Sequence, residues 1–307
     1  MRRGLGDRIP LLVVAGPTAS GKTALAVTLC EALHGEVVSA DSMQIYRGMD
    51  IATAKPSADE LARAPHYLIG VIDPAARFSV AQYAPLAHAA IRDIHARGKL
   101  PILCGGTGLY IQAVTENLTL TQGELEHGPG EGTWEALRAI DPAAAARIHP
   151  NDRKRISHAL ALYRATGVTL TEQNVRSRET PSPYRARMIF LNARDRQVLY
   201  DRIDARVDWM MAHGLVEEAR GRRQEAGMTA AQAIGYKELE PYFLGACSLE
   251  EAAARLKQET RRYAKRQLSW FRRQAREWNA REPGSCMELL IEDEALTRQA
   301  LHFAEVL

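Results

Sequence analysis

The feature that most constrains this sequence is a phosphate-loop pattern close to its start. Residues 16–23 read Gly-Pro-Thr-Ala-Ser-Gly-Lys-Thr, which matches G-x-x-x-x-G-K-[ST] at every fixed position. The apolar run at 11–15 suits a buried strand, and residues 24–29 suit the start of an amphipathic helix. Where a strand, a Gly-rich turn and a helix start follow one another, unpaired N–H groups face the turn and bind anions. The sequence therefore predicts a binding site for a di- or triphosphate.

The positions of this loop have distinct expected roles. Gly16 and Gly21 let the backbone curve around a phosphate, Lys22 supplies a positive charge, and Thr23 is the candidate ligand for Mg²⁺. Most such loops bind ATP or GTP, so a kinase or NTPase is one interpretation. The predicted diphosphate-binding residues of the loop are Gly16, Pro17, Thr18, Ala19, Ser20, Gly21, Lys22 and Thr23.

A carboxylate follows the second predicted strand. Residues 36–40 have the composition of a strand, and Asp41 comes directly after them. Groups at the carboxyl ends of strands in open α/β sheets line the ligand crevice. Asp41 is therefore a candidate for acid–base chemistry or metal binding beside the phosphates. The alternative from the residues alone is that Asp41 only caps a turn.

Three blocks together resemble one enzyme family. They are G-P-T-A-S-G-K-T at 16–23, D-S-M-Q-I-Y-R-G-M-D-I-A-T-A-K-P at 41–56 and G-G-T-G-L-Y at 105–110. This series is similar to that of the tRNA dimethylallyltransferases, which transfer a prenyl group to the adenosine beside the anticodon. Further blocks at 141–152, 155–157, 232–239 and 260–267 keep the family's order, so the resemblance spans roughly residues 10 to 275.

The resemblance implies a reaction and a set of site residues. The phosphate loop and Mg²⁺ would hold dimethylallyl diphosphate, and Asp41 would accept the proton as the N6 amine of adenosine 37 attacks the allylic carbon. The base would have to leave its stack, which an unpaired anticodon-loop base does at small cost. Gln44 would hydrogen-bond the adenine edge, with Ser42, Met43 and Thr107 along its approach. The expected catalytic set is Asp41, Lys22 and Thr23.

A basic helix is the strongest local signal for a nucleic-acid partner. Ser248 and Glu251 form a capping-box pattern, and helical periodicity continues past residue 270. Between 255 and 276, nine Lys and Arg residues accompany one acid, Glu259, and all but Lys257 fall within an arc of about 140°. A solvated helix face normally mixes charges of both signs. We therefore expect this face to bind RNA phosphate, in part through Arg261, Lys265 and Arg272, or in part the diphosphate itself.

A second basic cluster starts the predicted helix after Asp152. Its positive charges oppose the helix dipole, which an external anion would compensate, although a tolerated surface cluster is an alternative. His158 stands where the family often has Arg. The residues of this cluster that we expect to contact tRNA are Lys154, Arg155, Ile156, Ser157 and His158.

A third candidate lies in the helical region 193–214. Arg202 and Arg206 are four residues apart and would share one helix face. Arg206 is predicted to bind the diphosphate leaving group. Pairing of these arginines with Asp201 or Asp208 is the alternative.

The predicted fold is α/β, with a P-loop-type parallel sheet flanked by helices and interrupted by a helical subdomain. Strands are expected at 11–15, 36–40, 101–105 and 187–192, alternating with helices. The core would comprise 1–115 and 186–307. The insertion at 116–185, with helices near 134–147 and 152–165, would grip the anticodon stem. It is shorter than in relatives between Val114 and Asp141 and is rich in Gly and Glu there.

The composition is that of an ordinary globular enzyme. Hydrophobic residues make up 46% and charged residues 25% of the 307 positions, and the net charge is only +3. The apolar run after the basic start is too short for a signal peptide, and no stretch approaches a membrane span, so we expect a cytoplasmic protein. We also expect a monomer. The four cysteines lack metal or disulfide spacing. Two further alternatives are an adenylate prenyltransferase acting on free nucleotide and a P-loop kinase for a small molecule.

Overall fold

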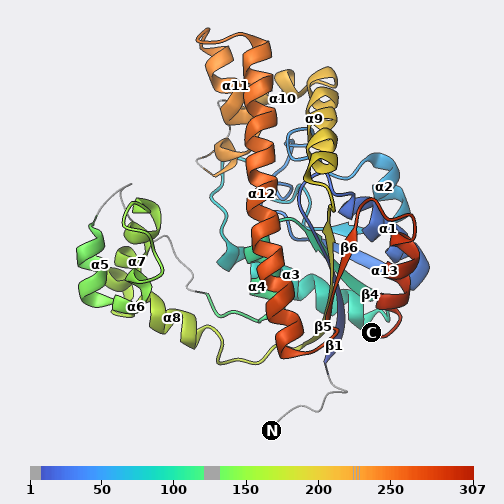
Figure 1. Cartoon of the computed structure of the whole chain (residues 1–307), viewed down its shortest axis with the longest axis horizontal. Helices are drawn as coiled ribbons and strands as arrows, with labels where there is room; N and C mark the ends of the chain where they lie inside the picture. The colour runs from blue at the N-terminus through green and yellow to red at the C-terminus, as the bar shows by residue number, and fades with distance from the viewer. Residues whose placement is uncertain (1–7, 121–131, 224, 226, 228) are drawn as a thin grey trace. The chain divides into compact units, whose positions relative to one another are not determined.

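A parallel sheet of six strands forms the centre of the larger part of the protein (Figure 1). The computed structural model describes residues 8–120, 132–223, 225, 227 and 229–307. The strand order is β3-β2-β4-β1-β5-β6, and every pairing is parallel. This architecture confirms the predicted fold class. The strands are β1 Ile9–Ala15, β2 Gly35–Ser39, β3 His66–Tyr67, β4 Leu100–Gly105, β5 Tyr184–Asn192 and β6 Cys286–Leu290.

The strand before the phosphate loop lies in the middle of this sheet. β1 pairs with β4 on one side and β5 on the other, so that Val14 lies beside Cys104 and Ile189. Residues 11–15 have no exposed surface. A strand covered on both faces has to be apolar throughout, which explains its sequence. Because all strands run in the same direction, the loops after β1, β2 and β4 meet at one edge of the sheet.

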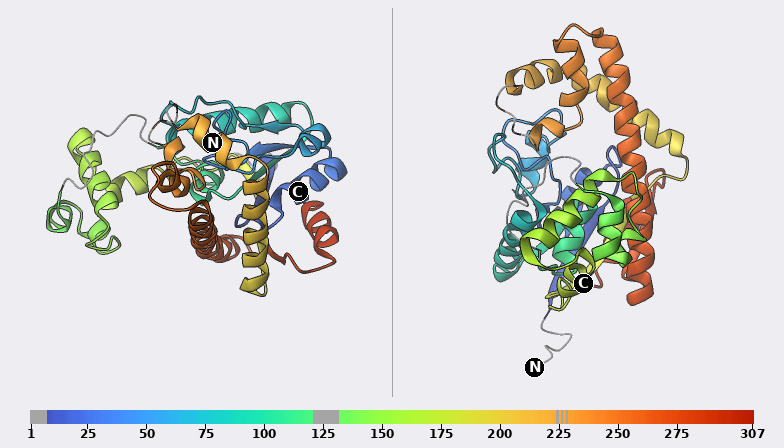
Figure 2. Two further views of the ribbon diagram at one scale, coloured as in Figure 1. Left: turned by 90° about the horizontal axis from the view of Figure 1, so that it is seen from above. Right: turned by 90° about the vertical axis from the view of Figure 1, so that its left-hand side faces the viewer.

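Helices cover both faces of the sheet (Figure 2). α1 (Lys22–Leu33) and α13 (Leu296–Ala304) pack together on one side, and α3 (Val80–Ala96), α4 (Gly108–Thr115) and α12 (Leu249–Arg281) lie on the other. The capping box predicted for α12 is present, because Ser248 Oγ accepts from the N–H of Glu251 and Glu251 accepts from the N–H of Ser248. The remaining helices of this part are α2 Ala58–Arg63, α9 Arg196–Ala212, α10 Leu215–Arg222, α11 Tyr236–Phe243 and the 3-10 helix η2 Ala230–Gln232.

The chain divides into two compact units. Unit 1 contains residues 1–115 and 183–307, and unit 2 contains residues 116–182. Residues 183–185 of the predicted insertion therefore lie in unit 1, because β5 already begins at Tyr184. The Gly- and Glu-rich stretch at 121–131 lies outside the described residues. The helices of unit 2 are α5 Trp134–Ile140, α6 Pro142–Ala145, α7 Arg153–Thr166 and α8 Leu170–Arg176.

The helix expected near 134–147 is in fact two helices. α5 ends at Ile140 and α6 starts at Pro142, because proline lacks an N–H and disfavours a helical residue before it. The buried carboxylate of Asp141 occupies the break. It accepts hydrogen bonds from the N–H of Ala144 at 2.9 Å and from the N–H and hydroxyl of Thr171 at 2.8 and 2.7 Å.

Two expectations from composition concern the described residues only. None of the helices that the structure describes combines the length and apolar composition of a membrane span. All four cysteines are free, and Cys30, Cys104 and Cys286 are buried.

A buried acid at the start of β2 fixes the connection before β4. Glu36 is 2% exposed and accepts two hydrogen bonds from the Arg97 guanidinium, one from Lys99 and one from the Tyr67 hydroxyl. The hydrogen bonds from Arg97, followed by those from Lys99 and Tyr67, lower the pKa of Glu36 to about 2. Because the folded protein favours the ionised form, Glu36 stabilises the fold above the ordinary carboxyl pKa. This contribution is lost as the pH falls towards 2.

We therefore expect Glu36→Gln to lower the melting temperature clearly at pH 7 and progressively less as the pH falls from about 4.5 towards 2. Glu31→Gln is the matched control, because its ion pair with Arg63 is exposed on both sides and contributes little. Calorimetric melting over this pH range makes the comparison. Equal losses for the two variants, or a loss from Glu36→Gln that does not shrink in acid, would show that the buried charge has no special role.

Candidate active site

One cavity of about 420 Å³ in unit 1 collects most of the predicted catalytic and diphosphate-binding residues. Its walls come from the phosphate loop, the segment after β2, the turn at 52–55, and helices α9 and α12. The charged groups that line it are Lys22, Lys55, Arg206, Lys237 and Arg266 on the basic side and Asp41 and Glu60 on the acidic side. The excess of positive charge suits a ligand with several negative charges.

The phosphate loop presents only part of its length to the cavity. Gly21 has a left-handed φ of 84° and comes directly before α1, a conformation that glycine adopts without strain. Gly16, Pro17 and Ser20 are buried and do not line the cavity, so their predicted contact with the ligand stays a prediction. A Cβ on Gly16 would lie 2.9 Å from Ser20 Oγ, so the loop is closely packed beneath its surface. The loop residues that do line the cavity are Thr18, Ala19, Gly21, Lys22 and Thr23.

A buried glutamine on α12 fixes the shape of this loop. The N–H of Thr18 donates to Gln267 Oε1 at 2.9 Å, and Gln267 Nε2 donates to the carbonyl of Gly106 at 2.9 Å. One side chain therefore joins the loop after β1 to the loop after β4. Gln267 is 5% exposed and lines the cavity, so both of its polar atoms are used away from bulk water.

Two half-buried cations line this cavity without a carboxylate partner among the described residues. Within the described residues, neither Lys22 nor Arg206 makes an ion pair; Lys22 Nζ donates to the carbonyl of Pro17 at 3.3 Å, and Arg206 Nη2 lies 3.5 Å from the carbonyl of Ala54. Burial lowers the pKa of both groups, and the nearby charge of Asp41 partly opposes this. Lys22 is half-buried. A desolvated cation without a partner favours binding of an anion.

Arg202 does not join Arg206 in the cavity. Its guanidinium lies 3.4 Å from the carbonyl of Ile291, and it does not line the cavity. The predicted alternative, pairing with Asp201 or Asp208, is wrong for both arginines. Asp201 accepts from Gln197, and Asp208 pairs with Lys257 at 2.6 Å.

Asp41 caps the turn after β2 and also lines the cavity. Its Oδ1 accepts from the N–H of Met43 at 2.9 Å and of Gln44 at 3.3 Å, which caps the turn after β2. The same carboxylate lines the cavity. In the part of the chain that the structure describes, Oδ2 makes no hydrogen bond. Asp41 therefore holds its turn with one oxygen, and its role in chemistry stays a prediction.

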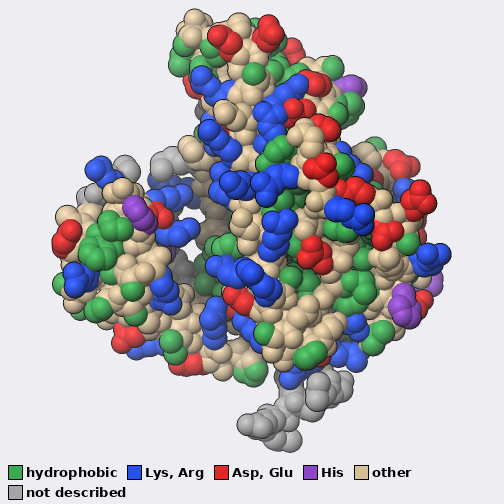
Figure 3. Space-filling model, in the orientation of Figure 1, with side chains coloured by type: hydrophobic (Ala, Val, Ile, Leu, Met, Phe, Trp, Pro, Cys, Tyr) green, Lys and Arg blue, Asp and Glu red, His purple; other side chains and the backbone are tan. Residues whose placement is uncertain are grey.

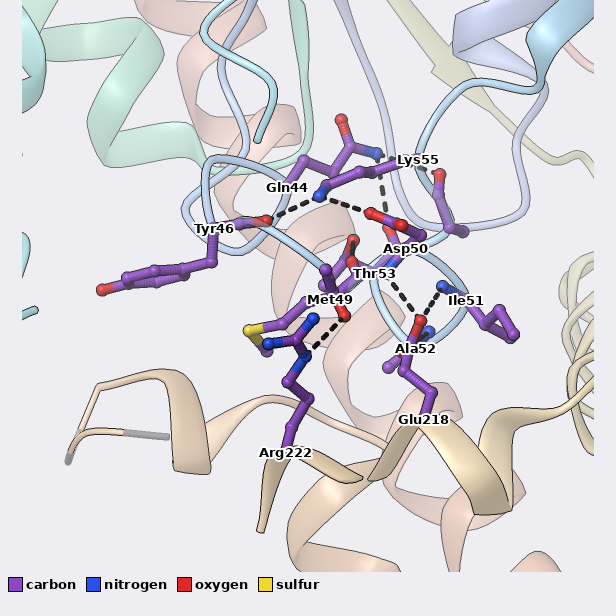
Figure 4. Close-up of polar contacts among 12 residues, drawn as sticks. Gln44, Tyr46, Met49, Asp50, Ile51, Ala52, Thr53, Lys55, Glu218 and Arg222 are labelled. Carbon is purple, nitrogen blue, oxygen red and sulfur yellow. Dashed lines mark hydrogen bonds and ion pairs between the residues drawn. The ribbon is translucent and has the colours of Figure 1, made fainter. Parts of the chain in front are cut away.

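The other predicted residues after β2 and β4 differ in whether they line the cavity. Ser42 and Met43 line it, whereas Thr107 does not; the Thr107 hydroxyl instead accepts from the N–H of Ser42 at 3.0 Å. Gln44 lines the cavity, but its Nε2 donates to the carbonyls of Thr53 and Ala54 at 3.3 and 3.0 Å (Figure 4). The donor group of Gln44 is therefore engaged within the protein, so we do not assign it to the adenine edge.

The donor set near the phosphate loop suits Mg²⁺ in part. The Thr23 hydroxyl and the Asp41 carboxylate both line the cavity, and hard oxygen ligands of this kind are those that Mg²⁺ takes together with phosphate oxygens and water. The described residues contain no group of three or more His, Cys, Asp or Glu that would hold a metal by itself. A site of this composition requires a phosphate ligand to complete it.

The basic face of α12 is partly engaged by α9. Arg261 donates to both carboxylate oxygens of Asp204 at 2.6 Å. Lys257, which lies outside the basic arc, pairs with Asp208. Lys265 and Arg272 are exposed, and Arg272 has one long contact of 3.5 Å to Asn192 Oδ1. Lys and Arg side chains form a band along this helix in Figure 3. Arg262 pairs with Glu259 at 2.6 Å and Arg273 with Glu277 at 3.7 Å. Arg261 is therefore less available to RNA than predicted, whereas Lys265 and Arg272 are exposed.

The predicted RNA-contacting block of α7 is divided by burial. Lys154, Arg155 and His158 are exposed, whereas Ile156 and Ser157 are 1% and 2% exposed and face the core of unit 2. We therefore do not carry the predicted RNA contact over to these two side chains. Asp152 accepts from the N–H of Arg155 and pairs with its guanidinium at 3.3 Å, so an internal acid offsets part of the basic first turn.

Sequence reasoning missed several cavity residues. Helical spacing places Thr260, Tyr263 and Gln267 on one face of α12, and that pattern could have shown a polar face at the site. Lys55 lies in the 41–56 block, but no role was expected for its side chain. No local pattern singles out Lys237.

Comparisons with known proteins agree with this geometry. The family model described as IPP transferase matches residues 44–274, and one described as isopentenyl transferase matches residues 9–72. The chain is 48% identical over 281 residues to a tRNA dimethylallyltransferase of Halalkalibacterium halodurans, covering 86% of this chain and 88% of that protein.

Solved structures give the same result. The crystal structure of a full-length tRNA isopentenylpyrophosphate transferase from Bacillus halodurans superimposes with a TM-score of 0.70 at 40% identity, over 97% of this chain and 95% of that one. A eukaryotic dimethylallyltransferase acting on tRNA gives a TM-score of 0.79 at 28% identity, over 97% of this chain and 78% of the other. The family model matches three quarters of the sequence, and the relative from Halalkalibacterium halodurans is 48% identical over most of its length. Both matches indicate the same family. The chain belongs to the IPP transferase family.

Proposed function

We propose that this protein transfers a dimethylallyl group from dimethylallyl diphosphate to the N6 amine of adenosine 37 in tRNA, releasing diphosphate. The observation that carries the proposal is the single cavity in which Lys22, Arg206 and Asp41 all take part. Two desolvated cations suit the diphosphate, and a carboxylate with a free oxygen suits the amine. The relatives named above are prenyl-transferring enzymes, which supports the same type of reaction for this protein.

The cations and the loop N–H groups bind the leaving group. Lys22 and the start of α1 contact the diphosphate from one side, and Arg206 contacts it from α9. Thr23 is the residue that would hold Mg²⁺. When bound, Mg²⁺ supplies positive charge that makes diphosphate a better leaving group.

The carboxylate of Asp41 receives the proton. As the N6 nitrogen bonds to the allylic carbon, the bond from that carbon to the diphosphate oxygen breaks and the diphosphate leaves with its electron pair. The amine proton passes to Asp41 Oδ2, which the turn holds in position through Oδ1. Ser42 and Met43 line the space next to this carboxylate.

The basic side chains of α12 and α7 bind the RNA backbone. Lys265 and Arg272 on α12, and Lys154 and Arg155 on α7, are exposed and suited to phosphate contacts. We place this activity in the cytoplasm and in a monomer. Unit 2 as a whole is proposed to grip the anticodon stem.

Two other activities are separable by one experiment. Purified protein is incubated with Mg²⁺, radiolabelled dimethylallyl diphosphate and unmodified tRNA, with AMP and ATP as alternative acceptors. Label in tRNA alone supports the proposal. Label in AMP or ATP supports an adenylate prenyltransferase, and consumption of ATP without prenyl transfer supports a P-loop kinase.

Removal of the loop cation is expected to abolish diphosphate binding. Lys22→Ala takes away a desolvated positive charge at the phosphate loop, so calorimetry should detect no binding of dimethylallyl diphosphate, with the melting temperature little changed. Lys265→Ala is the control, because Lys265 is exposed on α12 outside the cavity. Unchanged diphosphate affinity in Lys22→Ala would refute the phosphate-loop assignment.

Asp41→Asn separates the base from the turn cap. Asparagine keeps an oxygen for the N–H groups of Met43 and Gln44 but cannot take the proton. The single-turnover rate should fall by about 10²–10⁴-fold, with tRNA affinity little changed. Asp59→Asn, at an exposed position on α2, is the control. Normal chemistry combined with loss of tRNA binding would make Asp41 a positioning residue.

The α12 face is tested by salt dependence. Lys265→Gln with Arg272→Gln removes two exposed cations, so the slope of log affinity for tRNA against log salt should shrink by roughly 1.4–1.8. Arg261 is left intact because it is paired with Asp204. Arg92→Gln with Arg298→Gln removes the same charge from α3 and α13 and should leave the slope unchanged. Equal slopes for both double variants would remove this face from the RNA contact.

A further inference from the structure

One wall of the cavity is a tight turn whose position depends on a distant acid. Within the turn, the N–H of Ala54 donates to the carbonyl of Ile51 at 3.0 Å, and the N–H of Lys55 donates to the carbonyl of Asp50 at 3.0 Å. Residues 52–55 line the cavity. As in the first turn of a helix, the N–H groups at its beginning have no partner inside the turn and require one from elsewhere.

Glu218 of α10 supplies that partner. Its Oε2 accepts from the N–H of Asp50 at 2.8 Å and of Ile51 at 2.7 Å, and its Oε1 accepts from the N–H of Ala52 at 3.0 Å (Figure 4). The Tyr236 hydroxyl of α11 donates to the same carboxylate at 3.2 Å. Hydrogen bonds to an ionised carboxylate are stronger than those between neutral groups. A side chain some 166 residues along the chain thus holds three successive amides.

The other end of the turn is held from within the site. Gln44 Nε2 donates to the carbonyls of Thr53 and Ala54, and Lys55 Nζ donates to the carbonyl of Tyr46 and to Asp50 Oδ1, both at 2.6 Å. The donors at the start and the carbonyls at the end of the turn are therefore both bound by side chains. Glu218 is the member of this set that comes from outside the 44–55 segment and outside the cavity lining.

The 50–55 turn also supports Arg206, the cation on α9. Arg206 Nη2 lies 3.5 Å from the carbonyl of Ala54, two residues after the last amide held by Glu218. A shift of the turn would move this carbonyl and the wall formed by Ala52 and Thr53 together. Loss of the Glu218 anchor should therefore reach the proposed diphosphate contact without altering the phosphate loop.

We propose that Glu218 is a positioning residue for binding of the prenyl diphosphate, acting through the 50–55 turn and Arg206. The inference rests on the proposed function for the identity of the ligand. It differs from that proposal because Glu218 does not line the cavity and touches no reacting atom.

The full-length protein is tested as Glu218→Gln, with Glu217→Gln as the matched control. Glu217 is the adjacent acid on α10 and is exposed. Glutamine keeps the shape of Glu218 but brings an N–H₂ group against N–H donors. Hydrogen exchange of the peptide containing residues 50–52 should become faster in Glu218→Gln, while exchange in β1 stays the same. Calorimetric affinity for dimethylallyl diphosphate should fall roughly tenfold.

Kinetics separate positioning from chemistry. The KM for dimethylallyl diphosphate should rise in Glu218→Gln with little change in kcat, and Tyr236→Phe, which removes one donor to Glu218, should give a smaller change in the same direction. Unchanged exchange at 50–52, or faster exchange with unchanged diphosphate affinity, would overturn the inference. A wild-type enzyme that binds the diphosphate but transfers no prenyl group would refute the proposed function, and the exchange and affinity data would still decide the role of Glu218.

Discussion

The site depends on the link that the buried amide of Gln267 makes between α12 and two loops of the sheet. Its oxygen accepts from the N–H of Thr18 and its nitrogen donates to the carbonyl of Gly106, so the loops after β1 and β4 keep one separation. A neutral amide suits this position because it supplies one acceptor and one donor without placing a second charge beside Lys22. The same helix carries Tyr263 and Arg266 at the cavity and exposed cations on its other side. One wall of the cavity and the proposed RNA-binding face are therefore built on one element.

The electrostatic character of the cavity depends on which nearby cations have an acidic partner. Arg261 and Lys257 on α12 have acids of α9 as partners, whereas Lys22 and Arg206 are desolvated without one in the described part of the chain. A cation that loses water without gaining a carboxylate raises the free energy of the unliganded protein and is satisfied by an anionic ligand. Asp41 lies near both and lowers this cost, which keeps the site charged and ready for a diphosphate. The acid that is proposed to take the proton thus also supports the binding of the leaving group.

The sequence was sufficient where the signal is local and insufficient where it depends on distant contacts. The phosphate loop, β1 and the capped start of α12 were predictable because each is specified by a short run of residues. β3 has two residues and β6 follows a long helix without a periodic pattern, so both edge strands of the sheet were missed. The Asp141-Pro142 pair indicates the break between α5 and α6, although one helix was expected there. Glu218 and Gln267 act 166 and 249 residues away from their partners, and no spacing rule reaches that far.

We propose that one cavity holds the diphosphate between the phosphate loop and Arg206, with Asp41 near the allylic carbon. The most direct test is a crystal structure of the protein with Mg²⁺ and a non-reactive thio analogue of dimethylallyl diphosphate. We expect phosphate oxygens within hydrogen-bond distance of Lys22, the N–H groups at the start of α1 and Arg206, with the allylic carbon facing Asp41. An analogue bound elsewhere, or bound here with its prenyl group turned away from Asp41, would contradict it.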